Sequence, residues 1–503
     1  MEKTKKAGSF STRWGLIITM IGACVGTGNV WRFPRMAALH GQGSFVLAWT
    51  IILFVVSIPI CMVEMVMGRA TRHGGPGAFR DFLGKKYTWM GAFMALTTMM
   101  ITGYYTVIMS WCIQYAALSL KGFQSYDIVG LDNLFQQVSN GWLNAGLSVV
   151  LLLLTALVVS KDISKGIEKV GKVMTPALYV ILIVLAIRVL FLPGAVDGLN
   201  YLFDISADSF FSSDTWLAAL SQSAWSTGPG FGYTLTMAVY TKAKSDVTLN
   251  QSMQGLGDNS AALLAGFLVL PALFALAPNT EAAVGIAASG NYGLTFISLT
   301  QMFGTLAGGN IMSCFFFISL FFAAFTANII FYLTGVVPLI DAGMSKKQAV
   351  RVLLVPLAVL CIANGYSLDF LSNQDWVWGM ALIIGSLFTC FAVWRFGAEK
   401  MRTKYINIPE NELNVGKWWD VCIKFIAPIM MGAMLIWETV NSIVYEEQWW
   451  NPLLPTSTGT FLAQVALLAI IVICFNKKLA STIKHRYIDA GDPYPEIPPE
   501  HQG

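Results

Sequence analysis

Long apolar runs separated by short polar segments recur along the whole chain. A run of about 20 mostly apolar residues is long enough to cross a bilayer as one helix. Twelve such runs lie near residues 14–38, 44–68, 89–120, 143–160, 172–191, 213–240, 260–277, 308–342, 347–363, 376–396, 420–444 and 460–475. The pattern predicts an all-α, polytopic membrane protein with about twelve transmembrane helices.

Two of these runs contain residues that weaken helices. The first holds GACVGTGNVWRFP, from Gly22 to Pro34, and the sixth holds STGPGFG, from Ser226 to Gly232. An unpaired backbone group in hydrocarbon costs several kcal/mol, so a break at this depth needs a purpose. Gly22 and Gly26 could simply let two helices pack closely. The second break favours the alternative, in which freed backbone groups of two broken helices hold an ion and a substrate.

Composition agrees with a membrane protein. Of the 503 residues, 55% are hydrophobic and 12% are charged, with a mean hydropathy of +0.62, whereas a soluble domain carries about twice that charge. The first apolar run is long and lacks a small-residue cleavage site, so we expect no cleavable signal peptide. Eight cysteines lie in or beside apolar runs without CxxC spacing, and we expect free thiols. The four histidines show no ligand spacing.

Lysine and arginine are concentrated in alternate loops. The remaining loops are acidic or neutral, which places the basic loops and both termini in the cytoplasm. The membrane that we expect is the cell (inner) membrane. The basic segments hold Lys3, Lys5, Lys6, Arg13, Arg69, Arg72, Arg80, Lys161, Lys165, Lys242, Lys346, Lys400 and Lys477. Residues 278–309 are apolar enough for a re-entrant hairpin, residues 193–213 suit an ordered loop, and the polar, Pro-rich tail 489–503 is predicted to be disordered and cytoplasmic.

Polar residues inside apolar runs are functional candidates, because a central charge costs roughly 2.5–3.5 kcal/mol on insertion scales. They are Asn29, Arg32, Glu64, Tyr104, Tyr105, Gln222, Ser226, Asp258, Asn259, Thr326, Asn328 and Asp375. Glu64 lies near a span end and suits an anchor. The oxygen-bearing side chains suit a hard cation such as sodium, with a proton on Asp258 as the alternative. No phosphate-binding loop, nucleophile–base pair or nucleic-acid patch is present, so we expect no enzyme and no nucleic-acid partner.

Several motifs together resemble one family. They are TRWG, GACVGTGNVWRFP, KDISKGIEKVGKVMTP, LPGAVDGLNYLF, QSAWSTGPGFG and FFAAFT, within residues 12–475. The sequence resembles the sodium:neurotransmitter symporter family (solute carrier family six), particularly bacterial amino-acid transporters with the leucine-transporter fold. The resemblance implies one transporter domain over residues 1–503, with inverted repeats of five spans at 14–191 and 213–396. Each repeat would contain one broken helix, and the last two spans, 420–475, would be peripheral.

The resemblance also implies site residues. A first sodium site would use Cys24, Asn29, Ser226, Asp258 and the substrate carboxylate, and a second would use Gly22, Val25, Ala323, Thr326 and the position of Ala327. The substrate would contact Ala23, Gly26, Thr27, Gly28, Ile101, Tyr105, Trp225, Ser226, Gly228, Phe231, Ala327 and Phe331. The outer gate would pair Arg32 with Asp375, or with Asp369 as the alternative. The inner gate would involve Tyr240 and Asp341.

Some positions depart from the family pattern. Ala327 stands where a hydroxyl usually ligates the second sodium, so one or two sodium ions remain open. Trp49, Asp258 and Ala262 replace three of the chloride ligands of animal members, although Gln222 and Ser226 are present. Because the Asp258 carboxylate can supply the missing negative charge, we expect no chloride requirement. Ala7 stands where an inner-gate arginine is expected, and Lys5 or Lys6 is the candidate replacement.

Gly26 indicates the substrate class. Monoamine members of the family carry aspartate there, whereas glycine leaves room for the substrate's own carboxylate, so we expect an amino acid. Trp225 beside Gly228 favours a hydrophobic or aromatic one. The sequence thus predicts a sodium-coupled, chloride-independent amino-acid symporter that works by alternating access, with a homodimer left open. The alternatives are an amino-acid sensor or ion leak on the same scaffold, or proton-coupled transport.

Overall fold

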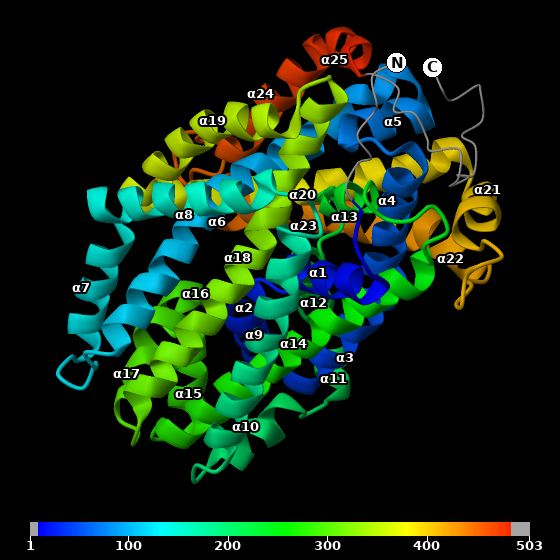
Figure 1. Ribbon diagram of the computed structural model, residues 1–503. Coiled ribbons are helices and arrows are strands. Elements are labelled where there is room, and N and C mark those ends of the chain that lie inside the picture. The colour runs from blue at the N-terminus through cyan, green and yellow to red at the C-terminus, as the bar shows by residue number, and fades with distance from the viewer. Residues whose placement is uncertain (1–8, 484–503) are drawn as a thin grey trace.

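The computed structural model describes residues 9–483, and every regular element in that range is a helix (Figure 1). Nine stretches of this range are long and apolar enough to cross a membrane. They are Gln42–Thr71 (α3 to α4), Lys85–Ser119 (mostly α6), Trp142–Ser160 (α8), Ile167–Leu190 (α9), Val247–Leu276 (α14), Gly309–Asp341 (α18), Lys346–Tyr366 (α19), Leu368–Phe396 (α20) and Trp418–Tyr445 (α22 to α23). The predicted all-α membrane architecture is confirmed.

The other predicted spans are bent or interrupted. α1 (Arg13–Cys24) and α2 (Thr27–Leu39) meet at 55°, and α24 (Thr458–Cys474) and α25 (Asn476–Thr482) meet at 56°. Counting each bent pair as one span gives up to eleven in the described part of the chain. α12 (Ser213–Thr227) and α13 (Tyr233–Ala238) occupy the place of the predicted sixth span. The prediction of about twelve spans is therefore consistent with the structure.

Both predicted helix breaks are present. The first separates α1 from α2 at residues 25 and 26, and the second separates α12 from α13 at residues 228–232. Gly228, Gly230 and Gly232 in the second break have φ values of 82°, 86° and 74°. Only glycine adopts such angles readily, which explains why this segment leaves the helical conformation.

Helix bounds differ most from the sequence prediction at α14, which begins at Val247 rather than near residue 260. Asp246 caps its first turn by accepting a hydrogen bond from the amide of Leu249 at 2.9 Å. The first turns contain Asn250, Gln251 and Gln254, which the sequence suggested for a loop, but all three are buried. They face neighbouring helices rather than lipid, so the apolar pattern alone placed the start too late.

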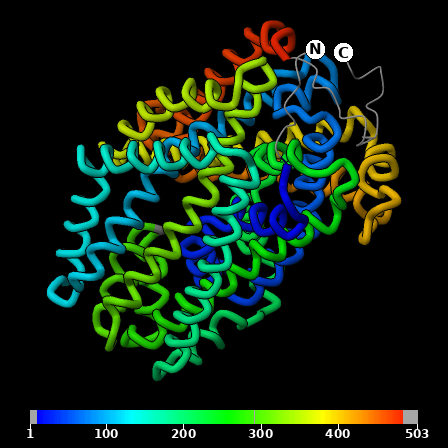
Figure 2. The backbone as a smooth tube through the Cα atoms, in the orientation of Figure 1, coloured from blue at the N-terminus to red at the C-terminus, as the bar shows by residue number. Residues whose placement is uncertain are grey.

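The two segments predicted to lie outside the membrane also contain helices. α10 (Ala195–Leu202) and α11 (Ala207–Phe210) lie where a plain loop was expected. α15 (Thr280–Ala287), α16 (Gly290–Tyr292), η3 (Gly293–Ser298) and α17 (Leu299–Gly304) fill the segment predicted as a re-entrant hairpin. Figure 2 shows α10 and α17 at one end of the bundle, and α25 at the other, where it packs against α5 (Gly75–Leu83).

The interrupted helices occupy the middle of the bundle. α1 packs against α9, α14 and α18, and α2 packs against α14 and α12. α6 and α18 lie beside them and pack extensively against each other (Figure 1). The backbone groups released at the two breaks are therefore enclosed by protein, the condition under which irregular backbone is tolerated at membrane depth.

Candidate functional site

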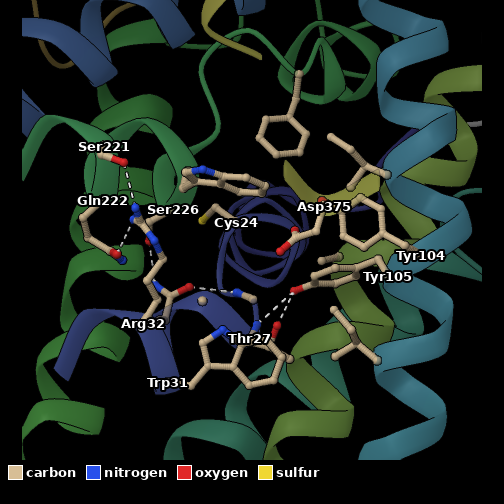
Figure 3. A pocket seen from close by; sticks show the side chains of 18 of the residues that line it. Cys24, Thr27, Trp31, Arg32, Tyr104, Tyr105, Ser221, Gln222, Ser226 and Asp375 are labelled. Atoms are coloured by element: carbon tan, nitrogen blue, oxygen red, sulfur yellow. Dashed lines mark hydrogen bonds between the residues drawn. The ribbon is translucent and has the colours of Figure 1, made fainter. Parts of the chain in front are cut away.

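A cavity of about 370 Å³ lies between the two helix breaks. Residues of α1, α2, α6, α12, α13, α16, α18, α20 and α23 and of the second break line it (Figure 3). Eleven of the twelve substrate residues implied by the resemblance are on its wall: Ala23, Gly26, Thr27, Gly28, Ile101, Tyr105, Trp225, Ser226, Phe231, Ala327 and Phe331. Gly228 is not on this wall, and a Cβ there would collide with the Tyr233 ring.

One end of the cavity is formed by the first turn of α2. The phenol oxygen of Tyr105 accepts a hydrogen bond from the Thr27 amide at 2.9 Å and contacts the Thr27 hydroxyl at 3.2 Å (Figure 3). A Cβ built on Gly26 would overlap this phenol oxygen, so Tyr105 can lie here only because residue 26 has no side chain. The N-terminus of a helix favours an anion, so this end suits a carboxylate.

Aromatic rings form another wall of the cavity, which adjoins this end through Tyr105. Phe231 and Phe331 stack with centroids 5.2 Å apart and planes at 22°. Tyr105 and Tyr233 lie against Phe331 at 5.6 and 5.9 Å, and Ile101 also lines the cavity. A small molecule with one anionic end and one apolar end fits this arrangement.

Asn29, Ser226 and Asp258 form a buried polar cluster beside the anionic end. The Asn29 amide nitrogen donates to Ser226 Oγ at 2.9 Å and to Asp258 Oδ1 at 2.7 Å. Ser226 Oγ donates to Asp258 Oδ2 at 2.7 Å, and Thr227 Oγ1 does so at 3.3 Å. Asp258 is fully buried, and no Lys or Arg among residues 9–483 forms a salt bridge with it.

This cluster fits a hard cation. A buried carboxylate needs a positive partner or a proton, and the side chains around Asp258 offer oxygen atoms that sodium prefers. Among the described residues no group of three or more His, Cys, Asp or Glu side chains is placed to share a metal. Cys24 lies beside the cluster, and its thiol contacts the carbonyl of Gln254 at 3.8 Å.

Residues of the predicted second sodium site also come together. Gly22 lies against Thr326, since a Cβ built on Gly22 would be 3.4 Å from Thr326 Cβ. Thr326 Oγ1 donates to the carbonyls of Phe322 at 2.8 Å and Ala323 at 3.1 Å. Ala327, the next residue, also lines the large cavity. The site thus offers backbone carbonyls and one hydroxyl, with no side-chain oxygen at position 327.

The predicted outer gate is not closed as an ion pair. Arg32 donates to Gln222 Oε1 at 2.8 Å and to Ser221 Oγ at 2.7 Å (Figure 3). Asp375 lines the same cavity, whereas Asp369 is exposed and does not. Of the two predicted carboxylates, Asp375 is therefore the one that faces the cavity of Arg32.

Hydrogen bonds close the end of the bundle opposite the predicted outer gate. The carbonyl of Tyr240 accepts from the Phe10 amide at 3.4 Å, and Asp341 Oδ2 accepts from the Gly74 amide at 2.7 Å. These bonds join the segment before α1 to the turn after α13, and the residue that caps α5 to the end of α18. Residues of the predicted inner gate therefore lie where the chain is closed in this structure.

Glu64 was assigned the wrong role by the sequence. Its carboxylate is fully buried and accepts a hydrogen bond from the Gly230 amide at 2.7 Å. It therefore supports the second helix break instead of anchoring a span end. Cavity residues to which the sequence analysis gave no role are Trp31, Arg35, Ile108, Ser221, Tyr233, Tyr292, Trp376, Met380 and Glu438. Arg35 and Glu438 lie toward the ends of α2 and α23, and the packing of these helices turns them toward the cavity.

Comparison with known proteins agrees with this geometry. The model of the sodium:neurotransmitter symporter family matches residues 7–127 and 121–482. The chain belongs to this family. Its members are transporters rather than enzymes, and they depend on sodium, so the protein is a multi-span membrane transporter of this class.

Relatives span nearly the whole chain. An uncharacterised sodium-dependent transporter of Methanocaldococcus jannaschii is 29% identical over 448 residues, covering 86% of this chain and 90% of the relative. The human sodium- and chloride-dependent neutral and basic amino acid transporter B(0+) is 24% identical over 528 residues, covering 88% and 80%. The crystal structure of MhsT in complex with L-phenylalanine matches with a TM-score of 0.73 and 26% identity, covering 85% of this chain and 99% of MhsT. The symporter therefore has the leucine-transporter fold.

Proposed function

We propose that this symporter couples inward sodium flow to the uptake of an amino acid by alternating access. One observation carries the proposal: the anion-binding start of α2 lies between the Asn29–Ser226–Asp258 cluster and the aromatic wall. An amino acid would place its carboxylate at the start of α2 and its side chain against the aromatic wall. We therefore propose substrate contacts for the eleven cavity-lining residues named above.

The preferred substrate class is hydrophobic or aromatic amino acids. Tyr105 occupies the space that an aspartate at position 26 would need, so the chain cannot present a carboxylate to a substrate amine there. Phe231, Phe331 and Ile101 offer apolar and aromatic surface to the side chain. The binding of L-phenylalanine by MhsT, a protein of the same fold, supports this choice.

Sodium binding is assigned to two groups of residues. The first consists of Cys24, Asn29, Ser226 and Asp258, and the second of Gly22, Val25, Ala323 and Thr326. When bound at the first group, sodium supplies positive charge beside the substrate carboxylate. Asn29 and Asp258 would hold the oxygen ligands of sodium in place, while Thr27 and Tyr105 would orient the substrate carboxylate. Substrate and ion then raise each other's affinity, which couples the two fluxes.

Alternating access would open the cavity to the two sides of the membrane in turn. The cavity reaches Arg35 and Glu438, at helix ends assigned to the outside by the loop charges, while the Tyr240 and Asp341 end is closed. The structure thus resembles a state open outward. Closure would bring Arg32 toward Asp375. The protein would lie in the inner membrane with both termini in the cytoplasm. If two copies form a homodimer, each copy would keep its own complete cavity.

Transport is expected not to need chloride. Asp258 places a fixed carboxylate where animal members of the family bind the anion, and Trp49 and Ala262 replace two further ligands. The human relative is named sodium- and chloride-dependent, so it is a useful reference. Uptake at saturating sodium should be equal in chloride and gluconate, and a loss of uptake in gluconate would contradict this part of the proposal.

The number of sodium ions sets the accumulation ratio. With about 100 mV, worth roughly 2.3 kcal/mol per charge, and a tenfold gradient, worth roughly 1.4 kcal/mol, one sodium supports roughly 400-fold accumulation of a zwitterion. Two sodium ions support about the square of that ratio. Measuring accumulation in proteoliposomes therefore separates the two stoichiometries.

Thermal stabilisation of the purified protein tests the proposal. Each of the twenty amino acids is added in sodium or in choline, since a ligand of the native state raises apparent stability by mass action. Stabilisation by hydrophobic or aromatic amino acids only in sodium is expected. Stabilisation that does not depend on sodium would favour a proton-coupled transporter or a sensor. No stabilisation by any amino acid would refute the substrate class.

A further inference from the structure

Thr175 is a buried threonine whose hydroxyl is left without a partner. It lies in α9, directly before Pro176, and its side chain is 4% exposed. Its Oγ1 makes no hydrogen bond within residues 9–483. Threonines in membrane helices usually bond the carbonyl four residues earlier, and Thr19, Thr326 and Thr334 in neighbouring helices do so at 2.6–3.0 Å. Thr175 is an exception that the mechanism above does not use.

The free hydroxyl points at the predicted second sodium site. A Cβ built on Gly22 would collide with Thr175 Oγ1 and would lie 3.5 Å from Thr326 Oγ1. The two threonine hydroxyls, one from α9 and one from α18, therefore lie beside the same residue of α1. α9 and α18 both pack directly against α1 and against each other, so this point is enclosed by three helices.

Backbone oxygen is available at the same point. The Val25 amide bonds the Ile21 carbonyl at 2.8 Å, and the Gly26 amide bonds Asn29 Oδ1 at 2.9 Å. The break between α1 and α2 thus leaves the Gly22 carbonyl without the amide that a continuous helix would supply. Thr326 donates its hydroxyl proton to carbonyls of its own helix, so the lone pairs of its oxygen remain available.

The helices also leave space beside Thr326. A small void of about 10 Å³ is lined by Thr19, Ile167, Val170, Gly171, Thr326 and Ile329, from the same three helices. That volume is near the lower limit for one water-sized guest. The packing of α1, α9 and α18 is therefore open on the Thr326 side of the predicted site.

We propose that the Thr175 hydroxyl is a ligand of the second sodium ion and replaces the hydroxyl that position 327 lacks. An unpaired hydroxyl in a dry interior is costly, whereas a valine would fill the same volume without that cost. A bound hard cation removes the cost, because it takes oxygen ligands such as hydroxyls and carbonyls. The inference rests on the proposed function, and it favours two sodium ions over one.

Four variants test it, each isosteric or nearly so. Thr175→Val removes only the hydroxyl, Thr175→Ser keeps it, Ala327→Ser adds one at the usual position, and the fourth combines Thr175→Val with Ala327→Ser. The readout is thermal stability titrated with sodium in the absence of amino acid, with choline keeping ionic strength constant. Without a substrate carboxylate the first site is incomplete, so this titration reports mainly the second.

The expected result is a shift in sodium affinity. Thr175→Val should raise the half-stabilising sodium concentration by about tenfold, equivalent to about 1.4 kcal/mol. Thr175→Ser should stay within about threefold of the unmodified protein, since it keeps the oxygen ligand. The double variant should recover most of the lost affinity. In uptake assays the Hill slope for sodium should fall toward one in Thr175→Val and rise again in the double variant.

Other outcomes overturn the inference without touching the proposed function. An unchanged sodium titration in Thr175→Val would show that the hydroxyl only packs against Gly22. If Thr175→Val melts at a lower temperature in choline but is stabilised by sodium as much as the unmodified protein, the conclusion would be the same. If Thr175→Val does not fold, an unchanged titration in Thr175→Ala would overturn the inference. Failure of the proposed function looks different, because then the unmodified protein would show no sodium-dependent binding of any amino acid.

Discussion

Removing the Glu168 carboxylate should loosen the closed end of the transporter. Glu168, at the start of α9, accepts hydrogen bonds from the Ser11 amide at 2.7 Å and from the Ser11 hydroxyl at 2.5 Å. Lys172 completes the group with a salt bridge of 2.6 Å. The family pattern expects an arginine at position 7, where this chain has alanine. Glu168 is thus a candidate for holding the segment before α1 in its place.

The expected size of the effect follows from these contacts. The Glu168 side chain is 1% exposed, and a hydrogen bond to a charged group contributes about 1.5–3 kcal/mol. Two such bonds tie Ser11 to α9, but Ser11 is exposed and water replaces part of their strength when the end opens. A net loss of about 2–3 kcal/mol is expected in Glu168→Ala, which corresponds to roughly 30- to 150-fold more opening.

Hydrogen exchange measures this opening directly. Amides of the segment containing Ser11 and the first turn of α1 should exchange roughly 30- to 150-fold faster in Glu168→Ala, because exchange follows the free energy of local opening. Glu412→Gln is the matched control. It removes an ion pair between Arg13 and a 66% exposed glutamate at the same end, and exposed pairs contribute little.

Two results would refute the reasoning. Unchanged exchange of these amides in a folded Glu168→Ala protein would show that Glu168 does not hold the segment closed. An equal acceleration in Glu412→Gln would show that any charge at this end has the same effect. A uniform acceleration over the whole chain would point to global destabilisation, so peptides from α10, at the other end of the bundle from α5 and α25, serve as the internal reference.

Three further predictions concern the breaks and the site. Asn29→Ala should abolish sodium-dependent amino-acid binding, because it removes the donors to Ser226 and Asp258. Unchanged binding, measured by calorimetry, would contradict the assignment of Asn29 to the first sodium site. Gly26→Ala should weaken amino-acid binding roughly 30-fold, since displacing Tyr105 costs two hydrogen bonds of about 1 kcal/mol each. Gly146→Ala, where a Cβ meets nothing, should leave the dissociation constant unchanged. Glu64→Ala should lower the melting temperature by exposing an unpaired amide worth about 1–3 kcal/mol, whereas Glu64→Gln should keep most of the stability, and equal effects would contradict this role.

Much of the fold could be predicted from local patterns. The ends of α8 were predicted within one residue, because lipid-facing helices are apolar throughout and their ends are marked by polar residues. Both breaks were predicted because glycine and proline act on their own backbone. The start of α14 was missed, since its polar residues face protein and no local feature shows this.

The candidate site divides in a similar way. The first turn of α2 was expected to contact the substrate because the motif GACVGTGNVWRFP, which is continuous in the sequence, carries the family resemblance. The bond between Glu64 and Gly230 joins residues 166 positions apart, and nothing near either residue indicates it. Arg35 and Glu438 were missed for the same reason, since their exposure depends on how α2 and α23 are placed around the cavity.

The sequence by itself determined that the chain is a helical membrane protein, where its helices break, and which residues carry oxygen or charge at membrane depth. These are properties of individual segments in a solvent without hydrogen-bonding partners. Only the tertiary structure decided that Tyr105 fills the space left by Gly26, that Glu64 supports the second break, and that Thr175 points at Gly22. Those contacts join helices far apart in the chain, and their distances depend on packing rather than on any local pattern.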